Sequence, residues 1–415
     1  MKNTDEILQR HQSTIRFKNK DMDFMFNWVI GIGQILGLSA AQAFHAVEGI
    51  KDGDPTGWRE GFKTQGNFQI EEAKKAKERK QHLIAGQSYI GAAYAYRAAL
   101  QYTDPTKPPF KKDVKTMETA FIQGVEMMNI PLKAIEVPFE EIKLPGYYLE
   151  HDDKNRPTLI MVGGGDTFRE DLFYFAGYPG WKRGYNVLMV DLPGQGTVPE
   201  LGYHFRTDMN KPISVLIDWL ENNAKRKPEK IAIYGVSGGG FFTAQGVTND
   251  SRIDAWIAST PITDIVQVFK KEFGHALKAP NWLINTLTKI AENLNEGTNI
   301  NLKKYAWQFG TSDFKKAIER VFAEAKPINI QKIKCPSLLL MGESEAEELK
   351  RQTVDLYEQL KERGENVTLR EFIKAEGGDD HCQLNNLRLC HLVVFDWLDE
   401  VFEYSDRPTD PRKLV

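Results

Sequence analysis

A serine set among glycines is the residue whose surroundings most clearly suggest chemistry in this chain. Residues 235–240 read "GVSGGG" and follow the β-forming run "KIAIY". Gly235, Ser237 and Gly239 fit the Gly-x-Ser-x-Gly pattern of a nucleophilic serine on a tight turn between a strand and a helix. Such a turn folds the backbone back on itself, so residues without a Cβ atom are favoured beside the serine. Because "GGFFTAQGV" can begin a helix, the context predicts a nucleophile rather than a flexible loop.

An acid and a histidine should follow this serine in chain order. The run "CPSLLLMGESEAEEL" ends a strand in a group of carboxylates, of which Glu345 is the first choice, with Glu343 and Glu347 as alternatives. Each of these glutamates could instead belong to the solvated first turn of a helix. His381 lies in "EGGDDHCQLNN", after the last strand-like run. We therefore predict that His381 takes the proton of Ser237 while Glu345 orients the imidazole.

Backbone N–H groups should hold the negative oxygen that forms when a serine attacks a carbonyl. Gly238 opens the helix after the serine and is the first predicted donor. The second should come from the loop after an earlier strand, which reads "MVGGGDTFRED" and offers Gly164, Gly165 or Asp166. A phosphate-binding role for these glycines is disfavoured because no Lys-Ser/Thr pair follows them.

Other classes of site have little support in the sequence. The segment "GIGQILG" lacks the preceding strand and the following acidic residue of a dinucleotide-binding fingerprint. There is no His-Glu-x-x-His motif and the histidines are scattered, so we expect neither a cofactor nor a metal. The net charge of −3 gives no basic surplus for binding nucleic acid.

Composition and the start of the chain indicate a cytoplasmic protein. The three cysteines form no Cys-x-x-Cys pair, and the first residues carry mixed charge without the apolar core of a signal peptide. The apolar segment "WVIGIGQILGLSAAQAF" is short for a membrane span and contains two glutamines, so a buried or lid helix is expected instead of membrane insertion.

The pattern of apolar residues along the chain changes near residue 132. Residues 1–131 show helical spacing of apolar residues, whereas residues 132–415 alternate short apolar strands with helices. This alternation predicts an α/β domain with a mostly parallel sheet, and its first two runs, "KAIEVPFEE" and "GYYLEH", suggest an antiparallel pair. The stretch at about 262–332 is too long for one crossover, so we expect a helical insertion there that includes "PNWLINTLTKIAENL" and "SDFKKAIERVFAEA".

Four motifs together resemble a known group of enzymes. The segments "GVSGGG", "VGGGDT", "DLPGQG" and "EGGDDHCQLNN" are similar to those of α/β-hydrolases related to 2,6-dihydroxypseudooxynicotine hydrolase and of fungal polyketide-shortening hydrolases. The resemblance implies the α/β-hydrolase fold, a mostly parallel eight-stranded sheet flanked by helices, with an N-terminal helical cap. It also implies a homodimer and a Ser-Asp-His triad, so Glu345 departs from the aspartate common in the group.

The resemblance further implies a choice of reactions. Members of the group cleave carbon–carbon bonds next to carbonyls, and their relatives cleave esters. Asp264 and Asp166 are the candidates for an auxiliary role, although Asp264 reads better as a helix N-terminal residue. The aromatic residues of the N-terminal part suit an aromatic or polyketide-like small molecule, but a helical core would use them equally. They are Trp28, Trp58, Tyr89, Tyr94 and Tyr96.

The resulting hypothesis is a serine hydrolase for a small or medium organic carbonyl compound. An acyltransferase or cyclase would use the same acyl-enzyme if water were kept out. A binding protein without catalysis could share the scaffold, but the presence of both Ser237 and His381 disfavours it. A peptidase of the prolyl-oligopeptidase kind is disfavoured because the N-terminal part lacks the repeating β pattern of a propeller.

Overall fold

The computed structural model describes residues 9–152, 156–277 and 296–404. The chain divides into two compact units. One comprises Met1–Pro131, Lys270–Trp307 and Thr311–Ala317, and the other comprises Leu132–Phe269, Gln308–Gly310 and Ile318–Val415. Residues of the expected 262–332 insertion thus fall into both units, and its segment "PNWLINTLTKIAENL" lies outside the described residues.

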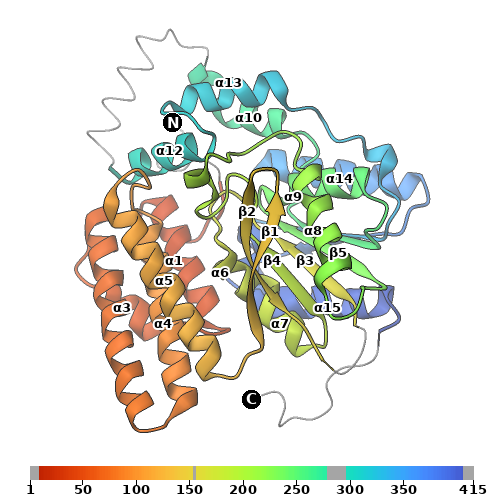
Figure 1. Ribbon diagram of the computed structural model, residues 1–415. Helices are drawn as coiled ribbons and strands as arrows, with labels where there is room; N and C mark the ends of the chain where they lie inside the picture. Colours follow the sequence, from red (N-terminus) through yellow and green to blue (C-terminus); the bar gives the residue numbers. More distant parts are fainter. Residues whose placement is uncertain (1–8, 153–155, 278–295, 405–415) are drawn as a thin grey trace. The chain divides into compact units, whose positions relative to one another are not determined.

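The first unit is helical (Figure 1). α4 packs against both α3 and α5, and the chain between α3 and α4 turns at Lys80, whose φ of 59° is left-handed. Trp58 is fully buried and its Nε1 donates to the carbonyl oxygen of Ala98 at 2.8 Å. The five aromatic residues singled out in the sequence are all buried. The helices up to residue 131 are α1 (Lys20–Gly33), α2 (Ala40–Ala46), α3 (Pro55–Glu78), α4 (His82–Leu100) and α5 (Pro108–Met127).

Three helices extend from one unit into the other along the chain. They are α10 (Ile265–Leu277), α12 (Glu296–Gln308) and α13 (Phe314–Glu324). Among the described residues, no helix is both long enough and apolar enough to cross a membrane.

The second unit is built on an eight-stranded sheet with the order β1-β2-β4-β3-β5-β6-β7-β8. β1 pairs antiparallel with β2 and β2 with β4, whereas all the remaining neighbours are parallel. The predicted α/β fold with a mostly parallel sheet is confirmed. The strands are β1 (Leu132–Phe139), β2 (Ile142–Leu149), β3 (Thr158–Val162), β4 (Asn186–Val190), β5 (Ile231–Val236), β6 (Ala255–Ser259), β7 (Ser337–Gly342) and β8 (Val367–Phe372).

Burial explains why the central strands are apolar runs. β3 to β7 are buried at every residue, whereas the edge strand β8 has exposed and half-buried positions. Helices flank the sheet (Figure 1), so its central strands have no solvent-facing side that would require polar residues. The principal helices of this unit are α6 (Arg169–Leu172), α7 (Tyr178–Lys182), α8 (Asn210–Asn223), α9 (Gly239–Asn249), α14 (Glu347–Glu362) and α15 (Leu387–Val401).

Close backbone packing surrounds the turn between β5 and α9. A Cβ atom on Gly235 would lie 2.2 Å from the carbonyl oxygen of Gly239, and one on Gly239 would lie 2.6 Å from that of Val162. The crowding expected at these two glycines is therefore confirmed. Gly240 is also constrained, since its Cβ would lie 2.0 Å from the carbonyl oxygen of Thr260, whereas a Cβ on Gly238 would meet its nearest atom at 3.7 Å.

This difference predicts that two substitutions, at Gly240 and at Gly238, change the stability of the fold by different amounts. Gly240→Ala should lower the free energy of unfolding by about 1–3 kcal/mol, because the backbone at Thr260 must shift to admit the methyl group. Gly238→Ala should leave the free energy of unfolding nearly unchanged, because ordinary contact distance surrounds that position. Urea unfolding of both variants measures the difference, and equal stability of the two would contradict the packing described.

Candidate active site

Ser237 occupies a strained turn between β5 and α9. Its φ of 55° lies in the left-handed region that non-glycine residues rarely adopt. The turn is held by two backbone hydrogen bonds. The N–H of Ser237 donates to the carbonyl oxygen of Ser259 at 2.6 Å, and the N–H of Gly240 donates to that of Ser237 at 2.8 Å. Backbone strain maintained in this way is common where a nucleophile must project from a sheet.

The three candidate acids lie in different surroundings. Glu345 has 0% of its surface exposed, and its Oε1 is 3.2 Å from Nδ1 of His381. Glu343 is exposed and its Oε2 accepts the N–H of Lys374 at 2.8 Å. Glu347 is exposed at the start of α14 and pairs with Lys350 at 2.7 Å. Glu345 is therefore the one of these three carboxylates that contacts the candidate base.

Two further groups contact the carboxylate of Glu345. The hydroxyl of Thr260 donates to its Oε2, and the N–H of Cys382 lies 3.4 Å from its Oε1. Thr260 and Cys382 are themselves buried. These contacts matter because a carboxylate removed from water is tolerated only where hydrogen bonds or an opposite charge replace its hydration.

His381 is buried beside Glu345, with 4% of its surface exposed. Because Nδ1 faces the carboxylate, Nε2 is the nitrogen that can exchange protons with a substrate or a nucleophile. Within the described residues, no hydrogen bond joins His381 to Oγ of Ser237, and catalytic hydrogen bonds are often long before a substrate binds. The loop of His381 is joined to the Ser237 turn through Ser259, whose carbonyl oxygen accepts from the N–H of Ser237 and from Sγ of Cys382, the residue after His381, at 3.2 Å.

The surroundings of His381 change its proton affinity. Burial by itself lowers the pKa of the imidazole, because it disfavours the charged form. Electrostatic interaction and hydrogen bonding with Cys382 and Glu345 outweigh burial and raise the pKa of His381 to about 10. The site is thus arranged to stabilise an imidazolium, which is the form a general base reaches after it accepts a proton.

The glycine loop after β3 lies against the Ser237 turn. A Cβ on Gly164 would be 2.6 Å from Cβ of Ser237 and 3.0 Å from the backbone nitrogen of Gly238. The backbone nitrogen of Gly165 is 3.7 Å from the place of a Cβ on Gly238. The structure therefore brings Gly164 and Gly165 to the first predicted donor, and Asp166 follows them as a half-buried residue.

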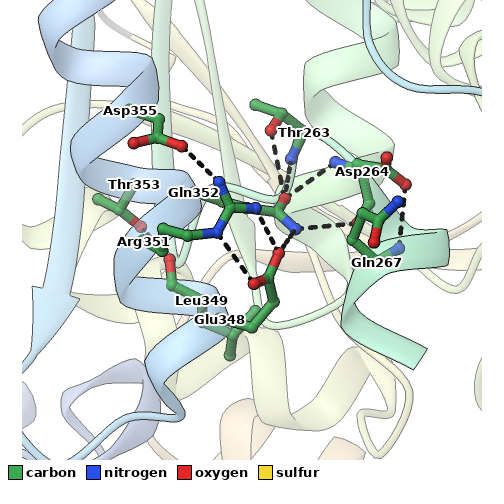
Figure 2. A network of polar contacts seen from close by, with 9 residues as sticks. All are labelled: Thr263, Asp264, Gln267, Glu348, Leu349, Arg351, Gln352, Thr353 and Asp355. Atoms are coloured by element: carbon green, nitrogen blue, oxygen red, sulfur yellow. Dashed lines mark hydrogen bonds and ion pairs between the residues drawn. The ribbon is translucent and has the colours of Figure 1, made fainter. Parts of the chain in front are cut away.

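Asp264 is held in a separate polar network, shown in Figure 2. Its Oδ1 accepts the N–H of Gln267 at 3.1 Å in the first turn of α10, the contact expected of a residue at a helix N-terminus. Gln352 holds the backbone of Asp264 on both sides, accepting its N–H at 2.9 Å and donating to its carbonyl oxygen at 3.0 Å. The network continues along α14 to Glu348 and Arg351.

The motifs of the sequence did not identify Thr260 and Ser259 as residues of the site, although the sequence contains a signal for them. Both residues stand at the end of the apolar run "AWIAST", and β6 pairs with β5 so that Ser259 lies opposite Val236. Polar residues at the carboxyl end of a strand beside the nucleophile strand lie where ligands of open α/β sheets bind. Only the pairing of β5 with β6 shows that Ser259 and Thr260 lie beside the turn that carries Ser237.

The acidic loop before His381 is engaged within the protein. Asp379 accepts the hydroxyl of Ser344 at 2.5 Å and the side-chain amide of Asn385 at 3.0 Å. Within the described part of the chain, no group of three or more His, Cys, Asp or Glu side chains is arranged to hold a metal ion.

Comparison with known proteins gives the chain relatives over nearly its whole length. It is 26% identical over 420 residues to the 20-hydroxy-prefusarin hydrolase FUS2 of Gibberella moniliformis, covering 93% of this chain and 97% of that protein. It is 24% identical over 418 residues to the hydrolase LUC6 of a Fusarium species, again covering 93% and 97%. These relatives are hydrolases by name.

Solved structures resemble the fold. The 2,6-dihydroxy-pseudo-oxynicotine hydrolase matches with a TM-score of 0.68 at 20% identity, over 92% of this chain and 98% of that one. The protein AbyA5 matches with a TM-score of 0.63 at 15% identity, over 93% and 96%. At these identities the likeness concerns the fold.

A family model also matches this chain. Residues 150–374, more than half of the chain, fit the model described as X-Pro dipeptidyl-peptidase (S15 family). That segment includes β3 to β8 and therefore Ser237 and Glu345. With the eight-stranded sheet and the hydrolase relatives, the match shows that the chain belongs to the X-Pro dipeptidyl-peptidase (S15) family and is a hydrolase of the α/β-hydrolase fold.

Proposed function

We propose that this protein is a serine hydrolase that cleaves an ester, or a carbon–carbon bond next to a ketone, in a small or medium organic substrate. The observation that carries the proposal is the buried Glu345–His381 pair, whose loop is bonded through the carbonyl oxygen of Ser259 to a serine held at positive φ. An acid, a base and a strained serine from three different loops form the constellation that nucleophilic acyl transfer needs.

In the proposed reaction, Oγ of Ser237 attacks the carbonyl carbon while Nε2 of His381 takes the hydroxyl proton. The carbonyl electron pair moves onto the oxygen, where N–H of Gly238 and an N–H of the 164–166 loop stabilise the charge. The oxyanion then re-forms the carbonyl and expels the leaving group, which takes the proton from His381. Water, deprotonated by His381, then attacks the acyl carbon. Oγ of Ser237 leaves with the proton from His381, which releases the acid and restores the serine.

The proposed substrate class rests on the named relatives and on the residues of the site. FUS2 is named for a hydrolytic step on 20-hydroxy-prefusarin, a small organic molecule. The family description names an X-Pro dipeptidyl-peptidase, so a peptidase is the second candidate function. A panel of aryl esters, β-diketones and X-Pro anilides separates these reactions, because each releases a different product. An acceptor alcohol or amine added to the same assays reports acyl transfer.

The nucleophile can be tested by covalent labelling. A fluorophosphonate probe should label the wild-type protein, and Ser237→Ala should not be labelled, since the attacking oxygen is gone. Ser214→Ala is the control and should be labelled, because Ser214 lies on α8 and its hydroxyl donates to Asp250 at 2.8 Å. Ester turnover by Ser237→Ala should fall by about 10³-fold or more. If the wild-type protein neither reacts with the probe nor hydrolyses any activated substrate, the proposed serine hydrolase function is wrong.

The role of Glu345 can be tested by the pH dependence of kcat/KM. Activity should increase with pH as His381, whose pKa is raised to about 10, loses its proton in the free enzyme. Glu345→Gln should lower kcat and move this transition to lower pH, because the raising influence of the carboxylate is removed while Cys382 remains. Glu347→Gln, an exposed glutamate, serves as the control.

The same raised pKa has a consequence for stability. Protonated His381 stabilises the folded state most fully below about pH 6.5, and that contribution is lost as the pH rises through about 10. If the pH dependence of kcat/KM in Glu345→Gln has its transition at the same pH as in the wild type, the proposed pairing of Glu345 with His381 is wrong.

A further inference from the structure

The turn after β4, which reads "DLPGQG", packs a buried amide against the glycine loop after β3. Gln195 has 1% of its surface exposed. Its Nε2 donates to the carbonyl oxygen of Gly163 at 2.5 Å and to that of Gly164 at 3.1 Å. Its Oε1 accepts the N–H of Leu192 at 3.0 Å. One side chain therefore bonds two consecutive carbonyl groups of the loop that lies beside Ser237.

The turn around Gln195 has little conformational freedom. Gly194 and Gly196 on either side have φ values of 89° and 52°, in the region that glycine adopts without strain. A Cβ on Gly194 would lie 2.3 Å from the ring of Phe205, and one on Gly196 would lie 2.2 Å from the carboxylate of Asp191. Close packing on both sides thus fixes the point from which Gln195 reaches the loop.

A second buried amide holds the next carbonyl group. Nε2 of Gln308 donates to the carbonyl oxygen of Gly165 at 2.6 Å and to that of Gly194 at 3.0 Å. Three consecutive carbonyl oxygens, those of Gly163, Gly164 and Gly165, are therefore bonded to glutamine side chains. Gln308 also connects the loop to the turn that carries Gln195.

The orientation of these carbonyls determines the orientation of the neighbouring N–H groups. In a trans peptide, the C=O of one residue and the N–H of the next point in opposite directions. With the carbonyl oxygens of Gly163 and Gly164 bonded to Gln195, the N–H groups of Gly164 and Gly165 point away from that amide. A rotation of either peptide would turn a carbonyl oxygen to the place of an N–H.

The carbonyl oxygen of Gly164 also accepts the hydroxyl of Thr167 at 3.2 Å, so the peptide between Gly163 and Gly164 depends most on Gln195. Without Gln195, rotation of this peptide would be easier, since glycine has the widest range of backbone conformations. It would also oppose catalysis, because a carbonyl oxygen directed at a developing oxyanion repels it. An oxyanion hole is effective because its donors are already oriented before the charge forms. Gln195 supplies this orientation without having to touch the substrate.

We propose that Gln195 is a positioning residue for oxyanion stabilisation, which fixes the peptides of Gly164 and Gly165 with their N–H groups available to the substrate oxygen. The proposal rests on the serine hydrolase function proposed above. It concerns a substrate whose carbonyl oxygen becomes negatively charged in a tetrahedral intermediate.

The test compares Gln195→Met with Gln245→Met. Gln245 is a matched control because it is also a buried glutamine whose amide accepts a backbone N–H, from Met209, and donates to a backbone carbonyl, of Thr207, both at 2.7 Å. With an aryl ester, kcat of Gln195→Met should fall by at least about 10-fold, towards the roughly 10²- to 10³-fold effect of losing one donor. KM should change by less than about threefold, since the uncharged substrate makes little use of the hole.

An aryl boronic acid provides a readout that a merely structural role would not change. It forms a tetrahedral adduct on a reactive serine, so its inhibition constant should rise in Gln195→Met by a factor similar to the fall in kcat. The Gln245→Met control should keep wild-type values of both quantities. Equal losses of kcat in the two variants, or a Gln195→Met defect confined to KM, would overturn the proposal.

A second variant guards against misfolding of the first. Gln195→Asn retains an uncharged amide, but its side chain is one methylene shorter and cannot hold both carbonyl oxygens. It should show a loss of kcat in the same direction while its thermal unfolding midpoint stays close to that of Gln245→Met. If both variants at position 195 fail to fold, Gln195 is a structural residue and the positioning role is wrong. Absence of ester turnover and probe labelling in the wild type would instead reject the serine hydrolase function itself.

Discussion

The carboxylate of Glu345 is the group on which the arrangement of this site depends. It has 0% exposure, and its hydrogen-bonding needs are met by His381, the hydroxyl of Thr260 and the N–H of Cys382. Removing one partner of a buried charge typically costs about 3–5 kcal/mol, because the remaining charge is left uncompensated. The loops after β6, β7 and β8 are therefore held together by one carboxylate, and the parallel pairing of these strands brings their ends to the same edge.

The loop after β6 extends this connection to Ser237, the proposed nucleophile. Thr260 contacts Glu345, and the carbonyl oxygen of Ser259 accepts both the N–H of Ser237 and Sγ of Cys382. Gly240 packs on the same segment, so a side chain there would displace it. The strained backbone of Ser237 and the buried acid are thus supported by two adjacent residues. This arrangement explains how a positive φ at a serine can be maintained.

The glycine loop follows the same physical rule with different groups. Three glycines in succession have high conformational entropy, and buried amide side chains limit it by bonding their carbonyl oxygens. The backbone of this loop is in this way anchored by side chains from two other segments of the chain. The pattern is consistent with a hydrolase whose catalytic groups come from loops while the sheet supplies rigidity.

Many of the strands and the turn at Ser237 could be predicted from the sequence, because they depend on interactions between residues close together in the chain. Apolar runs such as "KIAIYGV" predict buried strands because every position must suit a dry interior, and the glycines around Ser237 reflect local steric crowding. The choice among Glu343, Glu345 and Glu347 required the tertiary structure, because similar carboxylates within five residues differ only in what packs over them. The roles of Thr260 and Gln195 in the site were likewise visible only in the tertiary structure. Their partners lie 85 and 32 residues away in the chain, and only strand order and turn packing bring those atoms together.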